Sequence, residues 1–136
     1  MIYQENVLTC DIYNQIRNSV GWSSFSNRQA NSAIENSYNI VDVYDDKAVG
    51  MGRLVGDGIY YTIVDVAVDP QYWHRGIGQM IVKKLLDQAN NNLFKNERCT
   101  INLVVVQDKE EFYTKLGFKK ISDENCGSGM KLTLKK

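Results

Sequence analysis

Residues 65–79, DVAVDPQYWHRGIGQ, are decisive for the fold because an apolar, strand-like run leads into a glycine turn and then into a helix. The first turn of a helix leaves several backbone N–H groups without partners and carries the positive end of the helix dipole. Gly76 and Gly78 let a ligand approach those N–H groups closely. The segment therefore predicts a site that binds a phosphate-bearing anion through the main chain.

The residues on either side of the turn indicate which elements it joins. Tyr60–Val68 is rich in aromatic and β-branched residues, which favour a strand, and Asp69–Pro70 ends that strand. After Gly76, apolar side chains recur every three or four positions, which predicts a helix that ends at Asn90–Asn92. A strand, a phosphate-binding turn and a helix thus follow one another.

The rest of the chain supplies further strands and helices. A strand at Met1–Tyr3, a helix over Leu8–Val20 and a loop with a short helix over Trp22–Ser37 come first. The later expected elements are strands at Asn39–Tyr44, Ala48–Val55 and Cys99–Val106, a helix at Asp108–Leu116, and strands at Gly117–Ser122 and Met130–Leu134. We predict an α/β (α+β) fold with a mixed, mostly antiparallel central sheet flanked by helices, in which the strands before and after the central helix are parallel.

Length and composition indicate one small domain spanning residues 1–136, since 136 residues with 43% hydrophobic content suffice for a single core. Lys plus Arg and Asp plus Glu number 16 each, so no overall basic field attracts nucleic acid or an anionic membrane. With no bilayer-length apolar run and no signal-peptide pattern, we expect a cytoplasmic protein. Three widely spaced cysteines and one histidine predict no metal site.

Three motifs, in this order, resemble those of the GNAT superfamily of acetyl-CoA-dependent N-acetyltransferases. They are Val66–Pro70, Arg75–Gly78 and Phe112–Phe118, and the likeness covers the chain from Asn39 onward. The resemblance implies a GNAT-like acyl-CoA N-acyltransferase fold, a single N-acetyltransferase domain and acetyl-CoA as the cosubstrate.

The resemblance also implies how acetyl-CoA would be held. Main-chain amides of the glycine loop would bind the pyrophosphate, and the preceding strand would hydrogen-bond the pantetheine arm as if it were an added strand. A backbone N–H near Val66 would bind the thioester carbonyl, where negative charge develops. The chain departs from the family pattern at Trp73, where Gln or Arg is usual, and at His74, which is often glycine. The implied cofactor-binding residues are Val66, Ala67, Val68, Trp73, His74, Arg75, Gly76, Ile77, Gly78 and Gln79.

Two side chains are candidates for catalysis. The resemblance implies that Tyr113, a hydroxyl donor with a usual pKa of about 10, protonates the departing thiolate as a general acid; the alternative is that it packs its helix on the sheet. Asp65 is the best-placed carboxylate for a general base that accepts the proton of the amine. Strand alternation turns Asp65 away from the face of Val64 and Val66 unless a bulge intervenes, so a polar contact that fixes the strand explains it equally well.

The predicted function is transfer of acetyl from acetyl-CoA to a primary amine by direct attack in a ternary complex. The alternative is a catalytically weak acyl-CoA-binding or regulatory module. A dinucleotide-binding unit is disfavoured because Ile81 occupies the place of the third glycine. Trp22, Phe25 and Tyr60 would line an acceptor pocket or else pack in the core, and they favour a small-molecule amine with an apolar portion. The expected partners are this amine and, optionally, a second copy in a homodimer, with no nucleic acid and no membrane.

Overall fold

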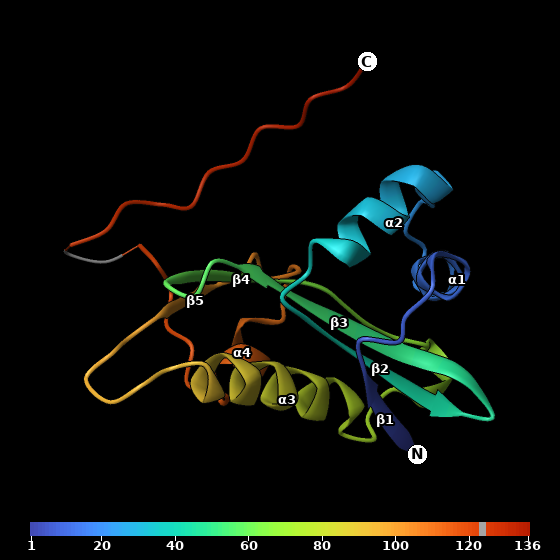
Figure 1. Ribbon diagram of the computed structural model, residues 1–136, viewed down its shortest axis with the longest axis horizontal. Helices are drawn as coiled ribbons and strands as arrows, with labels where there is room; N and C mark the ends of the chain where they lie inside the picture. Colours follow the sequence, from blue (N-terminus) through green and yellow to red (C-terminus); the bar gives the residue numbers. More distant parts are fainter. Residues whose placement is uncertain (123–124) are drawn as a thin grey trace. The chain divides into compact units, whose positions relative to one another are not determined.

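The computed structural model of the protein describes residues 1–122 and 125–136, which form two compact units, Met1–Leu103 and Val104–Lys136 (Figure 1). The first unit contains the whole sheet and the three longer helices, and the second contains the short helix α4 (Glu110–Thr114). The single domain over residues 1–136 stays a prediction.

The first unit is built on one mixed sheet of five strands in the order β1-β2-β3-β4-β5. The strands are β1 (Ile2–Glu5), β2 (Asn39–Asp45), β3 (Lys47–Gly56), β4 (Tyr60–Val68) and β5 (Thr100–Asn102). The first four pair antiparallel, and β5 runs parallel to β4. A parallel neighbour requires a crossover connection, which the central helix supplies. The predicted mixed, mostly antiparallel sheet is confirmed.

Helices cover both faces of this sheet (Figure 1). They are α1 (Cys10–Ser19), α2 (Asn27–Glu35) and α3 (Ile77–Asn91). Side chains alternate along β3, so Met51 packs with Tyr13 of α1 on one face, whereas Gly50 and Gly52 lie against Ile81 of α3 on the other. No helix among the described residues is long and apolar enough to cross a membrane.

The helix starts follow their sequence signals. Thr9 caps α1 by accepting a hydrogen bond from the backbone N–H of Ile12, and Ser26 caps α2 in the same way. Gly76 caps α3 in a left-handed conformation with a φ of 77°. Hydrogen bonds between the side chains of Asn14 and Arg17 of α1 and the backbone of Ser23 and Phe25 order the loop between α1 and α2. The predicted loop and short helix over Trp22–Ser37 are therefore present.

Several predicted elements near the C-terminus are wrong. The strand expected over Cys99–Val106 shrinks to β5, and the helix expected over Asp108–Leu116 shrinks to α4. Within the described part of the chain, Gly117–Ser122 and Met130–Leu134 form no strand. The apolar side chains of the last segment are 85–97% exposed. A strand needs a neighbour for its backbone hydrogen bonds, so alternation of apolar residues alone does not create one.

The contact between β3 and α3 yields a stability prediction. A Cβ built on Gly52 would lie 2.5 Å from Cγ2 of Ile81 and 3.2 Å from Cδ1 of Leu85. Gly52→Ala must therefore push α3 away from the sheet, and we expect it to lower the free energy of unfolding by about 1–3 kcal/mol. Urea unfolding followed by circular dichroism measures this. Gly50→Ala, whose nearest contacts are 3.3 Å, is the control; equal losses for the two variants would contradict the interpretation.

Candidate active site

The turn between β4 and α3 leaves its backbone amides free. Asp69 caps the short 3-10 helix η1 (Pro70–Tyr72), which follows it, by accepting a hydrogen bond from the N–H of Gln71 at 3.0 Å. His74 and Gly76 then take positive φ values of 62° and 77°. Among the described residues, no carbonyl or side chain accepts a hydrogen bond from the backbone N–H groups of residues 74–79. These N–H groups lie at the positive end of the α3 dipole, so they can bind an anion there.

The C-terminal half of β4 has one edge without a strand partner among the described residues. β5 pairs with β4 only through Tyr60–Thr62. The N–H of Asp69 donates to the carbonyl of Val49 at 2.8 Å, so alternation turns the N–H and C=O groups of Val66 and Val68 away from β3. An extended, amide-bearing chain can add to this edge as a strand does.

Trp73 occupies the end of that edge. Its indole N–H donates to the carbonyl of Val68 at 2.6 Å, although the residue remains 53% exposed. The neighbouring Arg75 is also exposed and lies over the ring of Tyr72, with its guanidinium carbon 4.9 Å from the ring centroid. The carbonyl of Val68 is therefore already used by the protein's own side chain.

Asp65 lies in a β-bulge in the middle of β4. The pairing passes from Met51 with Ala67 to Arg53 with Val64, which leaves two residues of β4 opposite one residue of β3. Asp65 has a φ of 56°. The sequence alone did not settle which way the Asp65 side chain points, because that depends on a bulge. The bulge is present, and it turns the Asp65 side chain toward α1.

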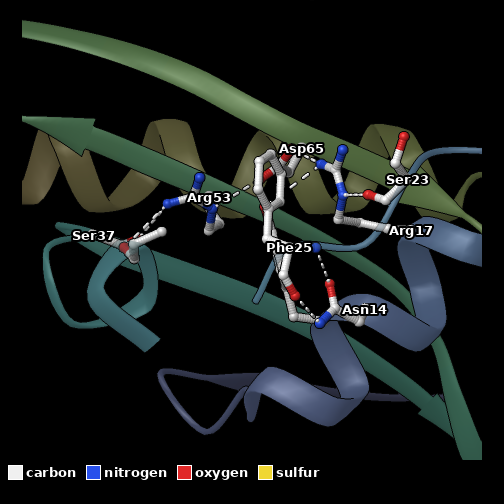
Figure 2. A network of polar contacts seen from close by, with 9 residues as sticks. Asn14, Arg17, Ser23, Phe25, Ser37, Arg53 and Asp65 are labelled. Atoms are coloured by element: carbon white, nitrogen blue, oxygen red, sulfur yellow. Dashed lines mark hydrogen bonds and ion pairs between the residues drawn. The ribbon is translucent and has the colours of Figure 1, made fainter. Parts of the chain in front are cut away.

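Three side chains donate hydrogen bonds to the Asp65 carboxylate, two of them as ion pairs (Figure 2). The hydroxyl of Tyr13 donates to Oδ2 at 2.7 Å, Arg17 Nη1 to Oδ1 at 3.0 Å, and Arg53 Nε to Oδ2 at 3.0 Å. Burial, and then the hydrogen bond to Asp65, raise the pKa of Tyr13 above its usual value, so its hydroxyl keeps the proton. The structure thus shows a polar contact that fixes the strand, and catalysis by Asp65 stays a prediction.

Two of the three aromatic residues predicted for the acceptor pocket come together. The Arg17 guanidinium carbon lies 5.4 Å from the Trp22 ring centroid and 4.6 Å from that of Phe25. Tyr60 is not with them, because it lies at the other end of β4, about 16 Å from Asp65 along the strand. There it lines a separate cavity of about 600 Å³ with residues such as Phe94. A pocket made by all three aromatic residues is not formed.

Tyr113 belongs to the second unit and lies on α4. Its ring packs edge-on against Phe112 and Phe118, with centroid separations of 4.9 Å and 5.9 Å. Burial raises the pKa of the Tyr113 hydroxyl, which therefore carries its proton at neutral pH. Gly117, with a φ of 98°, ends the helix and lets the N–H of Phe118 donate to the Tyr113 carbonyl at 3.1 Å. These ring contacts lie within the second unit, so the acid role and the packing of the helix on the sheet both stay predictions.

Comparison with known proteins assigns the family that this geometry suggests. Residues 35–120 match the family model of the acetyltransferase (GNAT) domain. The chain belongs to the GNAT family. The predicted superfamily and fold are therefore confirmed, and the matched range includes the strand, the glycine turn and the start of α3 at residues 65–79.

One curated relative and two solved structures illustrate the similarity. An uncharacterized N-acetyltransferase, ycf52, of Pyropia yezoensis is 33% identical over 80% of this chain and 64% of its own length, so the chain spans less than two thirds of that relative. A probable acetyltransferase of Staphylococcus aureus, SA2161, superposes with a TM-score of 0.82 and 26% identity over 98% of this chain and 100% of that one. Rv2747 of Mycobacterium tuberculosis, solved in complex with CoA and NLQ, has a TM-score of 0.70 and 22% identity over 90% and 74% of the two chains.

Sequence reasoning missed the partners of Asp65. Arg53, on β3, pairs with Asp65 across the sheet. Tyr13 and Arg17 were not singled out, although they are four positions apart and therefore lie on the same face of α1. Among the described residues, no group of three or more His, Cys, Asp or Glu side chains could hold a metal ion.

The glycine turn gives a prediction about CoA binding in this GNAT chain. Gly76→Glu places a negative charge beside the free amides of residues 74–79, so we expect its affinity for CoA, measured by isothermal titration calorimetry, to fall at least tenfold. Gly21→Glu is the matched control, because Gly21 also has a positive φ, 82°, and open space around it. If the two variants bind CoA equally well, the phosphate site is not at this turn.

Trp73 gives a second binding prediction. Trp73→Phe removes the indole N–H that occupies the Val68 carbonyl but keeps an aromatic ring. If the pantetheine arm uses that carbonyl, the variant should bind CoA about threefold to tenfold more tightly, the range of one net hydrogen bond. Titration of both proteins with CoA, and with adenosine 3′,5′-bisphosphate, which lacks the arm, separates the two parts of the site. A gain for both ligands, or for neither, would contradict competition for Val68.

Proposed function

We propose that this chain transfers acetyl from acetyl-CoA to a primary amine, most simply a small-molecule amine, by direct attack in a ternary complex. The observation that carries the proposal is the row of free amides at residues 74–79 beside the open edge of β4. Membership of the GNAT family supports it, as does the CoA bound to the structurally similar Rv2747.

Binding uses the main chain. The amides of residues 74–79 hold the phosphates, because their N–H groups and the α3 dipole both favour negative charge. The C=O of Val66 and the N–H of Val68 face the open edge of β4 and pair with the amides of the pantetheine arm, whereas the C=O of Val68 becomes available to the arm only when the Trp73 indole releases it. Acetyl-CoA, once bound in this way, supplies the activated thioester.

The bulge supplies stabilisation of charge in the proposed reaction. Val66 follows Asp65 in the bulge, and its N–H is directed to the open edge rather than to β3. A backbone donor fixed in advance stabilises the negative charge that develops on a thioester carbonyl oxygen when an amine attacks. No side chain at this position is needed for the effect.

Two proton transfers complete the proposed reaction. The attacking amine loses its proton to a base, either Asp65 or water. The departing thiolate takes a proton from the Tyr113 hydroxyl, whose raised pKa keeps the donor protonated across the neutral range. The acetyl–nitrogen bond forms first and gives a tetrahedral intermediate, and the acetyl–sulfur bond breaks when that intermediate collapses.

An acyl-CoA-binding module of low activity is the second candidate. The observation in its favour is the Asp65 carboxylate, which three donors already occupy. Such a module would bind CoA at the same turn but would release no CoA thiol with any amine. A screen of primary amines with acetyl-CoA, with free thiol measured, separates the two candidates.

Tyr113 provides the mechanistic prediction. Tyr113→Phe keeps the ring that packs on Phe112 and Phe118 but removes the proton donor, so we expect kcat to fall by about 100-fold or more with CoA affinity unchanged. In the wild type, activity should decline as the pH rises through the raised pKa, above the usual value of about 10, and this decline should be absent in the variant. Tyr3→Phe, on β1, is the control. An equal kcat in the Tyr113 variant and the wild type would leave Tyr113 with a packing role only.

A further inference from the structure

The Asp65 carboxylate links most of the elements that surround the bulge (Figure 2). It contacts α1 through Tyr13 and Arg17, and it contacts β3 through Arg53. Arg53 then continues to α2, where its Nη1 donates to the carbonyl of Ala33 at 3.1 Å. The same nitrogen donates to the Ser37 hydroxyl at 2.9 Å. One carboxylate therefore joins two strands and two helices.

Arg17 carries the link into the loop between α1 and α2. Its Nε donates to the carbonyl of Ser23 at 2.7 Å, and its carbonyl accepts from the N–H of Trp22 at 2.9 Å. The Asn14 side chain exchanges two hydrogen bonds with the backbone of Phe25, at 2.9 Å and 3.0 Å. The loop that bears the two clustered aromatic residues is thus held by the guanidinium that pairs with Asp65.

The same contacts leave Asp65 badly suited to accept a proton. Oδ2 accepts from both Tyr13 and Arg53, and Oδ1 accepts from Arg17. A proton arriving on Oδ2 would have to displace those hydrogen bonds. The side chains of Asp65 and its two arginine partners are only 11–13% exposed, so water does not readily replace them.

The backbone at Asp65 explains why such a link is needed. A residue with a side chain at a φ of 56° is strained, and it persists only where its surroundings hold it. Val66 is the next residue, so the direction of its N–H depends on this bulge. Contacts that hold Asp65 also hold that N–H.

We propose, building on the acetyl transfer proposed above, that Asp65 is a positioning residue and not the general base. Through Arg17 and Arg53 it fixes the Val66 N–H and the loop of residues 20–26 relative to one another. The thioester carbonyl and the acceptor amine then meet in one geometry, and water accepts the proton of the amine.

Kinetics of Asp65→Asn test the proposal, with Asp87→Asn on the exposed face of α3 as the matched control. We expect kcat to fall by about 100-fold, as for a small misplacement of reacting groups, with CoA affinity unchanged. The apparent pKa values of the pH profile of kcat/KM should stay where they are in the wild type. Loss of the acidic limb of that profile would show that Asp65 is the base, and an unchanged kcat would show that it positions nothing; either result overturns the proposal.

A second measurement does not depend on activity. Amide hydrogen exchange should quicken in Asp65→Asn both in residues 20–26 and in residues 65–67, and in neither segment of Asp87→Asn. Because removal of one partner from a buried ion pair can unfold a protein, Tyr13→Phe serves as the milder variant, with a smaller change of the same pattern. Exchange that changes in only one segment overturns the proposal. Failure of the proposed function would look different, since the wild type would bind CoA but acetylate no amine.

Discussion

The close approach of α3 to β3 is the constraint on which the candidate site depends. Gly50 and Gly52 present no side chains on that face of the sheet, and Ile81 and Leu85 of α3 fill the space that a Cβ would need. A helix held this tightly begins at a fixed point, directly after the turn that follows β4. The free amides of residues 74–79 are therefore rigidly placed beside the open edge of β4, and an anion site made only of peptide groups requires such rigidity.

The parts of the site that were predictable from the sequence are those with a local cause. The run of β-branched residues before Asp69, the glycine after His74 and the apolar spacing that follows each act within a few residues, and they gave the strand, the turn and α3. The Asp65 contacts have no such cause, because the hydrogen bond from Tyr13 spans 52 positions of the chain. The sequence analysis considered the bulge but could not predict it, because a strand pattern does not reveal at which residue the alternation of side chains is interrupted.

The errors near the C-terminus have the same origin. Thr100–Asn102 forms a strand because β4 offers it a parallel partner, whereas Met130–Leu134 pairs with no strand among the described residues and its apolar side chains remain exposed. β-propensity measures how well a residue fits a sheet that already exists, so it overestimates strands wherever the sheet ends. The grouping of Trp22, Phe25 and Tyr60 failed for a related reason, since aromatic character says nothing about which end of a strand a residue occupies.

In the proposed reaction, the chemistry is divided between two kinds of group. The cosubstrate is assigned to peptide N–H and C=O groups, which every sequence has, so recognition there depends on backbone shape and on glycine. The acceptor side is assigned to side chains on the α1–α2 loop, which Arg17 ties to Asp65 and so to the bulge. A substitution in that loop would therefore affect more than amine binding. A shift of the loop would move the Arg17 guanidinium, and with it Asp65 and the part of β4 that would hold the thioester. We therefore expect substitutions of Arg17 to change both amine selectivity and the rate of acetyl transfer. The affinity for the phosphates of CoA should not change with either, because it depends on the start of α3.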